Sequence, residues 1–219
     1  MGSRSVLFFR ASELRDYVLV TNFDGLAVAD APSFAAKPDS MGAVSPDYFV
    51  QMLNVGVAVY DRVGSLIAVT NLNDFFRIGT NFPAGSMQDS RLLYDSVSNR
   101  WVACAQDQTS GQVALAVSND RNPTDFAGGW SKYLIAGRRD GNALGLQAMG
   151  MDANGVYVDV LRYQGQTSTN AGHSVIGIKK PEIYLGNLIT NSTEIPSSEG
   201  IPVWYIQPAV NSDSLQTNG

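Results

Sequence analysis

The sequence predicts an all-β protein built from short antiparallel strands, and three observations carry this prediction. Charged residues make up only 16 % of the chain, against about 25 % in typical globular domains, so uncharged polar residues must supply much of the surface. Twenty-one glycines and nine prolines punctuate the chain, as turns between short strands require. Short β-branched or aromatic runs alternate with these turn residues, and only residues 12–17 and 71–76 have the pattern of a helical turn.

The predicted strands fall into three units. The first holds residues 48–54, 56–60 and 65–69, the second 91–94, 101–105, 112–118 and 130–135, and the third 146–151, 156–160, 174–178 and 183–185. A fourth unit begins at residues 203–206. Asp61, Asp95 and Asp152 each stand at a turn, where a carboxylate can accept backbone N–H groups. These aspartates are 34 and 57 residues apart, which suits repeated units with loops of unequal length.

A four-stranded antiparallel unit must stack on neighbours to bury both of its faces. A β-propeller, complete or partial, achieves this by radial stacking of blades. A β-sandwich is the alternative, because it also uses short alternating strands. We expect an N-terminal extension over residues 1–22, a β-propeller-like domain over residues 23–211 and a polar tail over residues 212–219.

The charge and hydropathy pattern argues against several classes of partner. The net charge is −5 and no Lys/Arg run is present, which disfavours nucleic-acid binding and anionic membrane surfaces. No apolar run approaches the ~20 residues of a membrane-spanning helix, so we expect no membrane insertion. The apolar run at residues 6–9 is too short for a signal-peptide core.

Single residues of chemical interest have plain structural interpretations. Cys104, the sole cysteine, lies in an apolar run and is interpreted as a small buried hydrophobe. His173, the sole histidine, lies among Gly, Thr, Asn and Ser, and we expect it to face solvent. Trp101, Trp130 and Trp204 fall in predicted strands and are expected in the core.

A series of short motifs occurs in one order along most of the chain. They are Phe23-Asp-Gly-Leu26, the Lys37-Pro-Asp-Ser-Met-Gly-Ala-Val stretch through Asn54, Ala58-Val-Tyr-Asp-Arg62, residues 89–95 with Arg100-Trp101, Ala116-Val-Ser118 with Asn122-Pro-Thr124 and Trp130, and Gln207-Pro-Ala-Val210. In this order they resemble a group of bacterial extracellular proteins predicted to be β-propellers. Ser45, Asp47 and Asn122 depart from the family pattern, and family members continue past the Gln-Pro-Ala-Val motif. The resemblance implies a propeller at the cell surface or outside the cell, and it supplies no assigned reaction.

Four residues are candidates for a binding site. Asp39, Asp47 and Asp89 each precede an apolar strand, comparable to the positions where glycosidase propellers place channel carboxylates. Arg91 is suited to orient a sugar hydroxyl or carboxylate. The alternatives are that the aspartates cap turns or hold a structural calcium ion, although the Asp-x-Asp-x-Asp calcium spacing is absent. We predict no catalytic residue, because no Glu lies in these motifs, and no cofactor, with structural calcium as the open alternative.

Three functions follow from these features. The first is an extracellular or cell-surface module that binds a glycan or a protein partner. The second is a glycoside hydrolase-like enzyme that uses Asp39 and Asp89. The third is a structural subunit of an extracellular assembly, including a homo-oligomer, because an open ring of blades leaves strand edges that recruit partners.

Overall fold

The computed structural model describes residues 22–26, 39–136, 143–163, 170–187, 192–196 and 206–213. Within these residues the protein is all-β, as predicted, with three four-stranded antiparallel sheets and two short helices. Sheet 1 contains β1 (Met41–Val44), β2 (Tyr48–Leu53), β3 (Gly56–Asp61) and β4 (Leu66–Thr70). Sheet 2 contains β5 (Met87–Asp95), β6 (Arg100–Asp107), β7 (Gln112–Ser118) and β8 (Trp130–Ala136). Sheet 3 contains β9 (Ala143–Met151), β10 (Gly155–Tyr163), β11 (Asn170–Lys179) and β12 (Ser192–Pro196).

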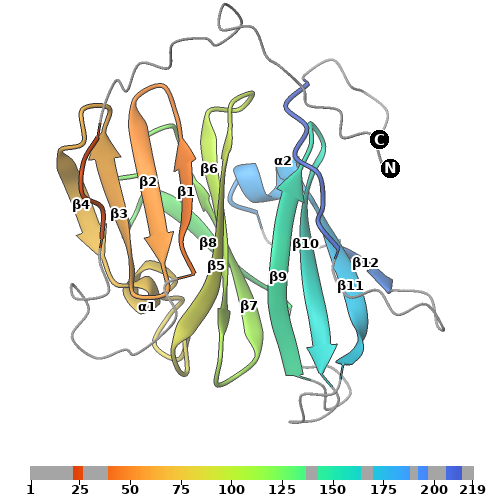
Figure 1. Cartoon of the computed structure of the whole chain (residues 1–219). Helices are drawn as coiled ribbons and strands as arrows, with labels where there is room; N and C mark the ends of the chain where they lie inside the picture. Colours follow the sequence, from red (N-terminus) through yellow and green to blue (C-terminus); the bar gives the residue numbers. More distant parts are fainter. Residues whose placement is uncertain are drawn as a thin grey trace, which may run out of the picture.

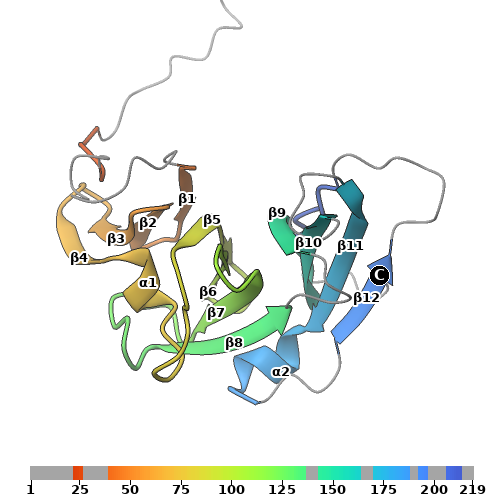
Figure 2. The same cartoon turned by 90° about the horizontal axis from the view of Figure 1, so that it is seen from below.

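The three sheets are arranged radially, side by side in chain order (Figures 1 and 2). Within each sheet the strands follow chain order. The first strands of the three sheets, β1, β5 and β9, lie on the inner side of this arrangement. Strand β1 contacts β5, and β5 contacts β9. Residues 206–213 continue this row, since Val210 forms a parallel bridge with Met151 of β9. No sheet closes on itself in the part of the chain that the structure describes.

The middle sheet is covered on both faces. On β6 and β7, small alanines alternate with larger apolar residues. Ala103 and Ala116 face the core shared with sheet 1, whereas Val102, Cys104 and Leu115 face the core shared with sheet 3. A strand that is buried on both faces has a continuous run of apolar residues. This explains the apolar sequences of β6 and β7. The predicted burial of Cys104 is confirmed.

The tryptophan predictions are confirmed where the structure describes them. Trp101 and Trp130 are buried in the core between sheets 1 and 2, while Trp204 lies outside the described residues.

The three turn aspartates accept backbone N–H groups as predicted. Asp61 Oδ1 accepts from Val63 and Ser65, and Asp95 and Asp152 make the corresponding bonds in their own turns. The turns are not equivalent, however. Asp95 and Asp152 follow the first strand of their sheets, whereas Asp61 lies at the end of the third strand of sheet 1. The unequal spacing of the aspartates thus reflects different turns as well as unequal loops.

Several element predictions need correction. Residues 183–185, predicted as a strand, instead fall at the end of α2 (Lys180–Tyr184), where Pro181 occupies the first turn. Strands β1 and β12 were not predicted. The helical turn at residues 71–76 is confirmed as α1 (Leu72–Phe75), with the Asn71 side chain accepting the Asp74 N–H at 2.8 Å.

Other predictions fall outside the described residues. They include the helical turn at residues 12–17 and the start of a fourth unit at residues 203–205. Among the residues that are described, no helix is long and apolar enough to cross a membrane.

Candidate functional site

Two of the predicted site residues meet where sheets 1 and 2 adjoin. Asp39 lies just before β1 and Arg91 lies on β5. Arg91 Nη1 donates to Asp39 Oδ2 at 2.9 Å and to the Ser90 carbonyl oxygen at 2.7 Å. Both side chains of the ion pair are partly buried. The pair therefore ties the inner strands of two neighbouring sheets together.

Asp89 belongs to the same neighbourhood. The pairing of β5 with β6 shifts between Gln88 and Arg91, so Asp89 lies in a bulge. Asn54 Oδ1, from the β2–β3 turn, accepts the Asp89 N–H at 2.8 Å. Asp89 and Asp39 have φ values of 54° and 41°, a left-handed conformation that aspartate tolerates better than most residues. Part of the reason for aspartate at these two positions is thus backbone geometry.

Asp47 lies at the opposite end of the sheets. It stands in the β1–β2 turn, where its carboxylate is 3.8 Å from Arg121 Nη1. The Ser45 hydroxyl accepts the N–H groups of Asp47 and Tyr48 and fixes this turn. The four predicted residues therefore form two separate groups, and Asp47 does not join Asp39, Asp89 and Arg91.

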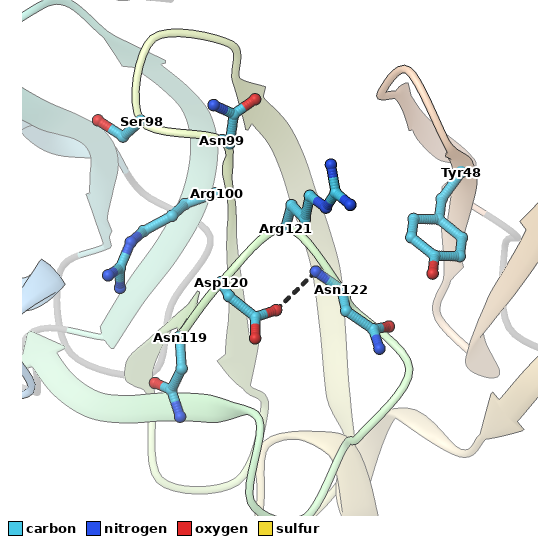
Figure 3. A pocket seen from close by; sticks show the side chains of 8 residues that line it. All are labelled: Tyr48, Ser98, Asn99, Arg100, Asn119, Asp120, Arg121 and Asn122. Atoms are coloured by element: carbon cyan, nitrogen blue, oxygen red, sulfur yellow. Dashed lines mark hydrogen bonds between the residues drawn. The ribbon is translucent and has the colours of Figure 1, made fainter.

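Asp47 borders a polar hollow that sequence reasoning did not assemble, here named the turn-end groove. Its larger part has a volume of about 670 Å³ and is lined by Tyr48, Ser98, Asn99, Arg100, Asn119, Asp120, Arg121 and Asn122. The adjoining part has a volume of about 500 Å³ and is lined by Pro46, Asp47, Tyr48, Asp61, Arg62, Val63 and Arg121. Tyr48 and Arg121 belong to both parts. Figure 3 shows Tyr48 on one side and the β7–β8 loop on the other.

The β7–β8 loop owes its shape to side chains that bond to its own backbone. Asp120 Oδ1 accepts the Asn122 N–H at 2.7 Å, and Asn122 Oδ1 accepts the Thr124 N–H at 3.1 Å. Two indoles anchor it from the core: Trp101 Nε1 donates to the Arg121 carbonyl and Trp130 Nε1 to the Pro123 carbonyl. The Arg121 backbone is therefore fixed, although its side chain is 72 % exposed.

The groove carries charges of both signs beside neutral donors and acceptors. Its lining contains three arginines, three aspartates, three asparagines, a serine and a tyrosine; the charged residues are Arg62, Arg100, Arg121, Asp47, Asp61 and Asp120. Arg100 is held in place because Nη1 donates to the carbonyl groups of Ser118 and Tyr184. Only Pro46 and Val63 are apolar. Such a surface can make many hydrogen bonds to a neutral polyol.

The prediction that His173 faces solvent is wrong. His173 lies on β11 and is buried, with Nδ1 at 3.1 and 3.2 Å from the two carboxylate oxygens of Asp159 on β10. Burial raises the pKa of Asp159, although the contacts with His173 and the Ile206 N–H oppose that rise. The flanking polar residues suggest a turn, and no local signal reveals the long strand pairing of β10 with β11.

The described residues bring together no group of three His, Cys, Asp or Glu side chains that could hold a metal ion. No protein-family model matches the chain, and no curated protein matches it.

Proposed function

We propose that the three sheets are consecutive blades of an extracellular β-propeller and that the turn-end groove binds a glycan. The row of inner strands β1, β5 and β9 supports the propeller, as does the order of family-like motifs from residue 23 to residue 210. Location outside the cell rests on the same resemblance. One observation carries the binding proposal: four separate turns converge to form a hollow lined almost entirely by residues with hydrogen-bonding side chains.

The composition of the groove favours a glycan over a protein partner. The centre of a protein–protein interface is depleted in charged residues and rich in aromatic and apolar ones. The lining of the groove includes three aspartates, which such interfaces disfavour, and a single aromatic residue. Sugar hydroxyl groups both donate and accept, so they match the mixture of amides, carboxylates and guanidinium groups.

The hydrolase alternative has less support. A glycosidase needs two carboxyl groups that face the scissile bond from opposite sides. Asp39 is occupied by its ion pair with Arg91, and the Asp89 main chain is held in a bulge by Asn54. These contacts favour a role in joining the inner strands of sheets 1 and 2.

Arg121→Ala tests the glycan site. Its backbone is anchored by Trp101, so removal of the exposed side chain should leave the loop in place. We expect screening of the purified protein on a glycan array to identify a ligand, and calorimetry to show about tenfold weaker binding by Arg121→Ala, equivalent to about 1.4 kcal/mol. Arg77→Ala, which removes another exposed arginine outside the groove, is the matched control. Absence of any glycan ligand, or equal affinity of both variants, would refute the site.

A further inference from the structure

One wall of the turn-end groove is the exposed turn between β5 and β6. Ser98, Asn99 and Arg100, here named the β5–β6 wall, line the groove. Ser98 and Asn99 are exposed, and Asn99 has a φ of 54°. The Tyr94 hydroxyl donates to Asn99 Oδ1 at 2.9 Å. Because the tip of the turn is exposed, the position of the wall depends on the residues that hold the two ends of the turn.

Both ends of this turn contact one residue of α2, Tyr184. At the start of the turn, Asp95 Oδ1 accepts the Ser98 N–H at 3.3 Å, and the Tyr184 hydroxyl donates to Asp95 Oδ2 at 2.6 Å. At its end, Arg100 Nη1 donates to the Tyr184 carbonyl oxygen at 3.0 Å. Arg100 Cζ also lies 5.2 Å from the centre of the Tyr184 ring, within the range of a cation–π contact. Tyr184 therefore links the two ends of the turn.

Helix α2 is fixed in place by contacts that do not involve the Tyr184 side chain. It follows β11 directly, and Ile183 is buried in the core between sheets 2 and 3. The Tyr133 hydroxyl of β8 donates to the Ile183 carbonyl oxygen at 2.9 Å. Lys180 is buried beside Asp95. Substitution of Tyr184 should therefore leave the helix in its position between the two sheets.

We propose that Tyr184 is a positioning residue for glycan binding, which holds the β5–β6 wall in its binding conformation before a glycan arrives. This inference rests on the proposed function of the turn-end groove. A wall that is already ordered loses less conformational freedom on binding, so its order in the free protein raises the affinity. The described residues that line the groove do not include Tyr184. Tyr184 therefore acts through Asp95 and Arg100 and not through contact with a sugar.

The order of the β5–β6 wall can be measured without a glycan. Backbone NMR relaxation gives an order parameter for each amide, about 0.85 for a rigid backbone and below about 0.6 for a flexible one. Tyr184→Leu keeps an apolar side chain but removes the ring and the hydroxyl, so the order parameters of Ser98 and Asn99 should fall toward the flexible value. Tyr184→Phe, which removes only the hydroxyl, should give a smaller fall. Tyr157→Phe is the matched control, because it removes the bond from Tyr157 to Asp152 in the corresponding turn of sheet 3, and it should leave both amides unchanged.

Glycan binding by the same proteins is measured on a glycan array over a series of protein concentrations. We expect about tenfold weaker binding by Tyr184→Leu, about threefold weaker binding by Tyr184→Phe and no change for Tyr157→Phe. A purely structural role of Tyr184 would lower the urea midpoint and leave the order parameters and the affinity unchanged. Unchanged order parameters at Ser98 and Asn99, or unchanged affinity of Tyr184→Leu for a glycan that the wild type binds, would overturn the proposal for Tyr184 alone. Absence of binding by the wild type would refute the groove and the positioning role together.

Discussion

A buried ion pair joins sheet 2 to the helix that follows β11, and its loss should destabilise the protein strongly. Lys180 Nζ donates to Asp95 Oδ2 at 2.8 Å, and the Tyr184 hydroxyl donates to the same oxygen at 2.6 Å. The Lys180 and Asp95 side chains are only 6 % and 3 % exposed. Asp95 Oδ1 accepts the N–H groups of Val97 and Ser98. One carboxylate therefore holds its own turn and the contact between two sheets.

Asp95→Asn separates these two roles, because an amide oxygen still accepts from the turn but cannot neutralise Lys180. Removal of one partner of a buried ion pair costs about 3–5 kcal/mol, since the other charge stays buried and uncompensated. In a chain of this length about 3 kcal/mol corresponds to a decrease in Tm of roughly 6–12 °C. Asp61→Asn is the control, because Asp61 also accepts two turn N–H groups, at a solvent-exposed turn.

Urea unfolding of Asp95→Asn, Lys180→Met and the double variant measures the coupling. We expect a coupling energy of at least about 1 kcal/mol, because the double variant no longer buries a lone charge. Additive effects of the two substitutions would refute the ion-pair argument. Burial favours a raised pKa for Asp95, but the bonds from Lys180 and Tyr184 outweigh it and hold the pKa below the ordinary 3.8. The stabilisation is therefore present above pH 3.8 and lost as the pH falls through the lowered pKa, a loss that Asp95→Asn should not show.

Three further predictions concern the buried groups. Burial raises the pKa of Asp159 above 3.8, so the protonated carboxyl stabilises the folded state at low pH, and this stabilisation is lost as the pH rises from 3.8 through the raised pKa. Asp159→Asn should flatten this part of the plot of urea midpoint against pH, and an unchanged plot would contradict the burial argument. Burial raises the pKa of the Cys104 thiol to about 12, so native protein should resist alkylation at pH 8 and react only when unfolded, whereas rapid native labelling would show an accessible thiol. Trp130→Phe keeps an aromatic ring in the core but removes the bond to the Pro123 carbonyl, which should cost about 1 kcal/mol in urea unfolding; no measurable cost would mean that the bond does not stabilise the loop.

The strands of sheet 2 could be predicted from sequence because their apolar composition agrees with their buried environment. Apolar runs such as Gln112–Ser118 are bounded by turn residues and are long enough to be strands. Strand β1 was missed because Met41–Val44 has only four residues, of which two are exposed, so it shows little pattern. Residue Ile183 has strand-like neighbours, but Pro181 starts a short helix there.

The candidate site was only partly accessible to sequence reasoning. The expected placement before a strand holds for Asp39, which lies just before β1, whereas Asp89 lies within β5 rather than before it. The sequence could not show that Arg91 pairs with Asp39, because 52 residues separate them. The turn-end groove depends on which turns share an end of the sheets, and that follows from strand direction and register. Arg121 enters the groove because Trp101 anchors its backbone, a contact with no sequence signature.

The two-sided burial of β6 and β7 has a consequence for the order in which the protein opens. In the row of three sheets, sheet 2 packs against two neighbours, whereas sheets 1 and 3 pack against one each. The stability of each sheet depends on these contacts between neighbours. Local opening should therefore begin at sheets 1 and 3, and backbone amides of β6 and β7 should exchange with solvent most slowly.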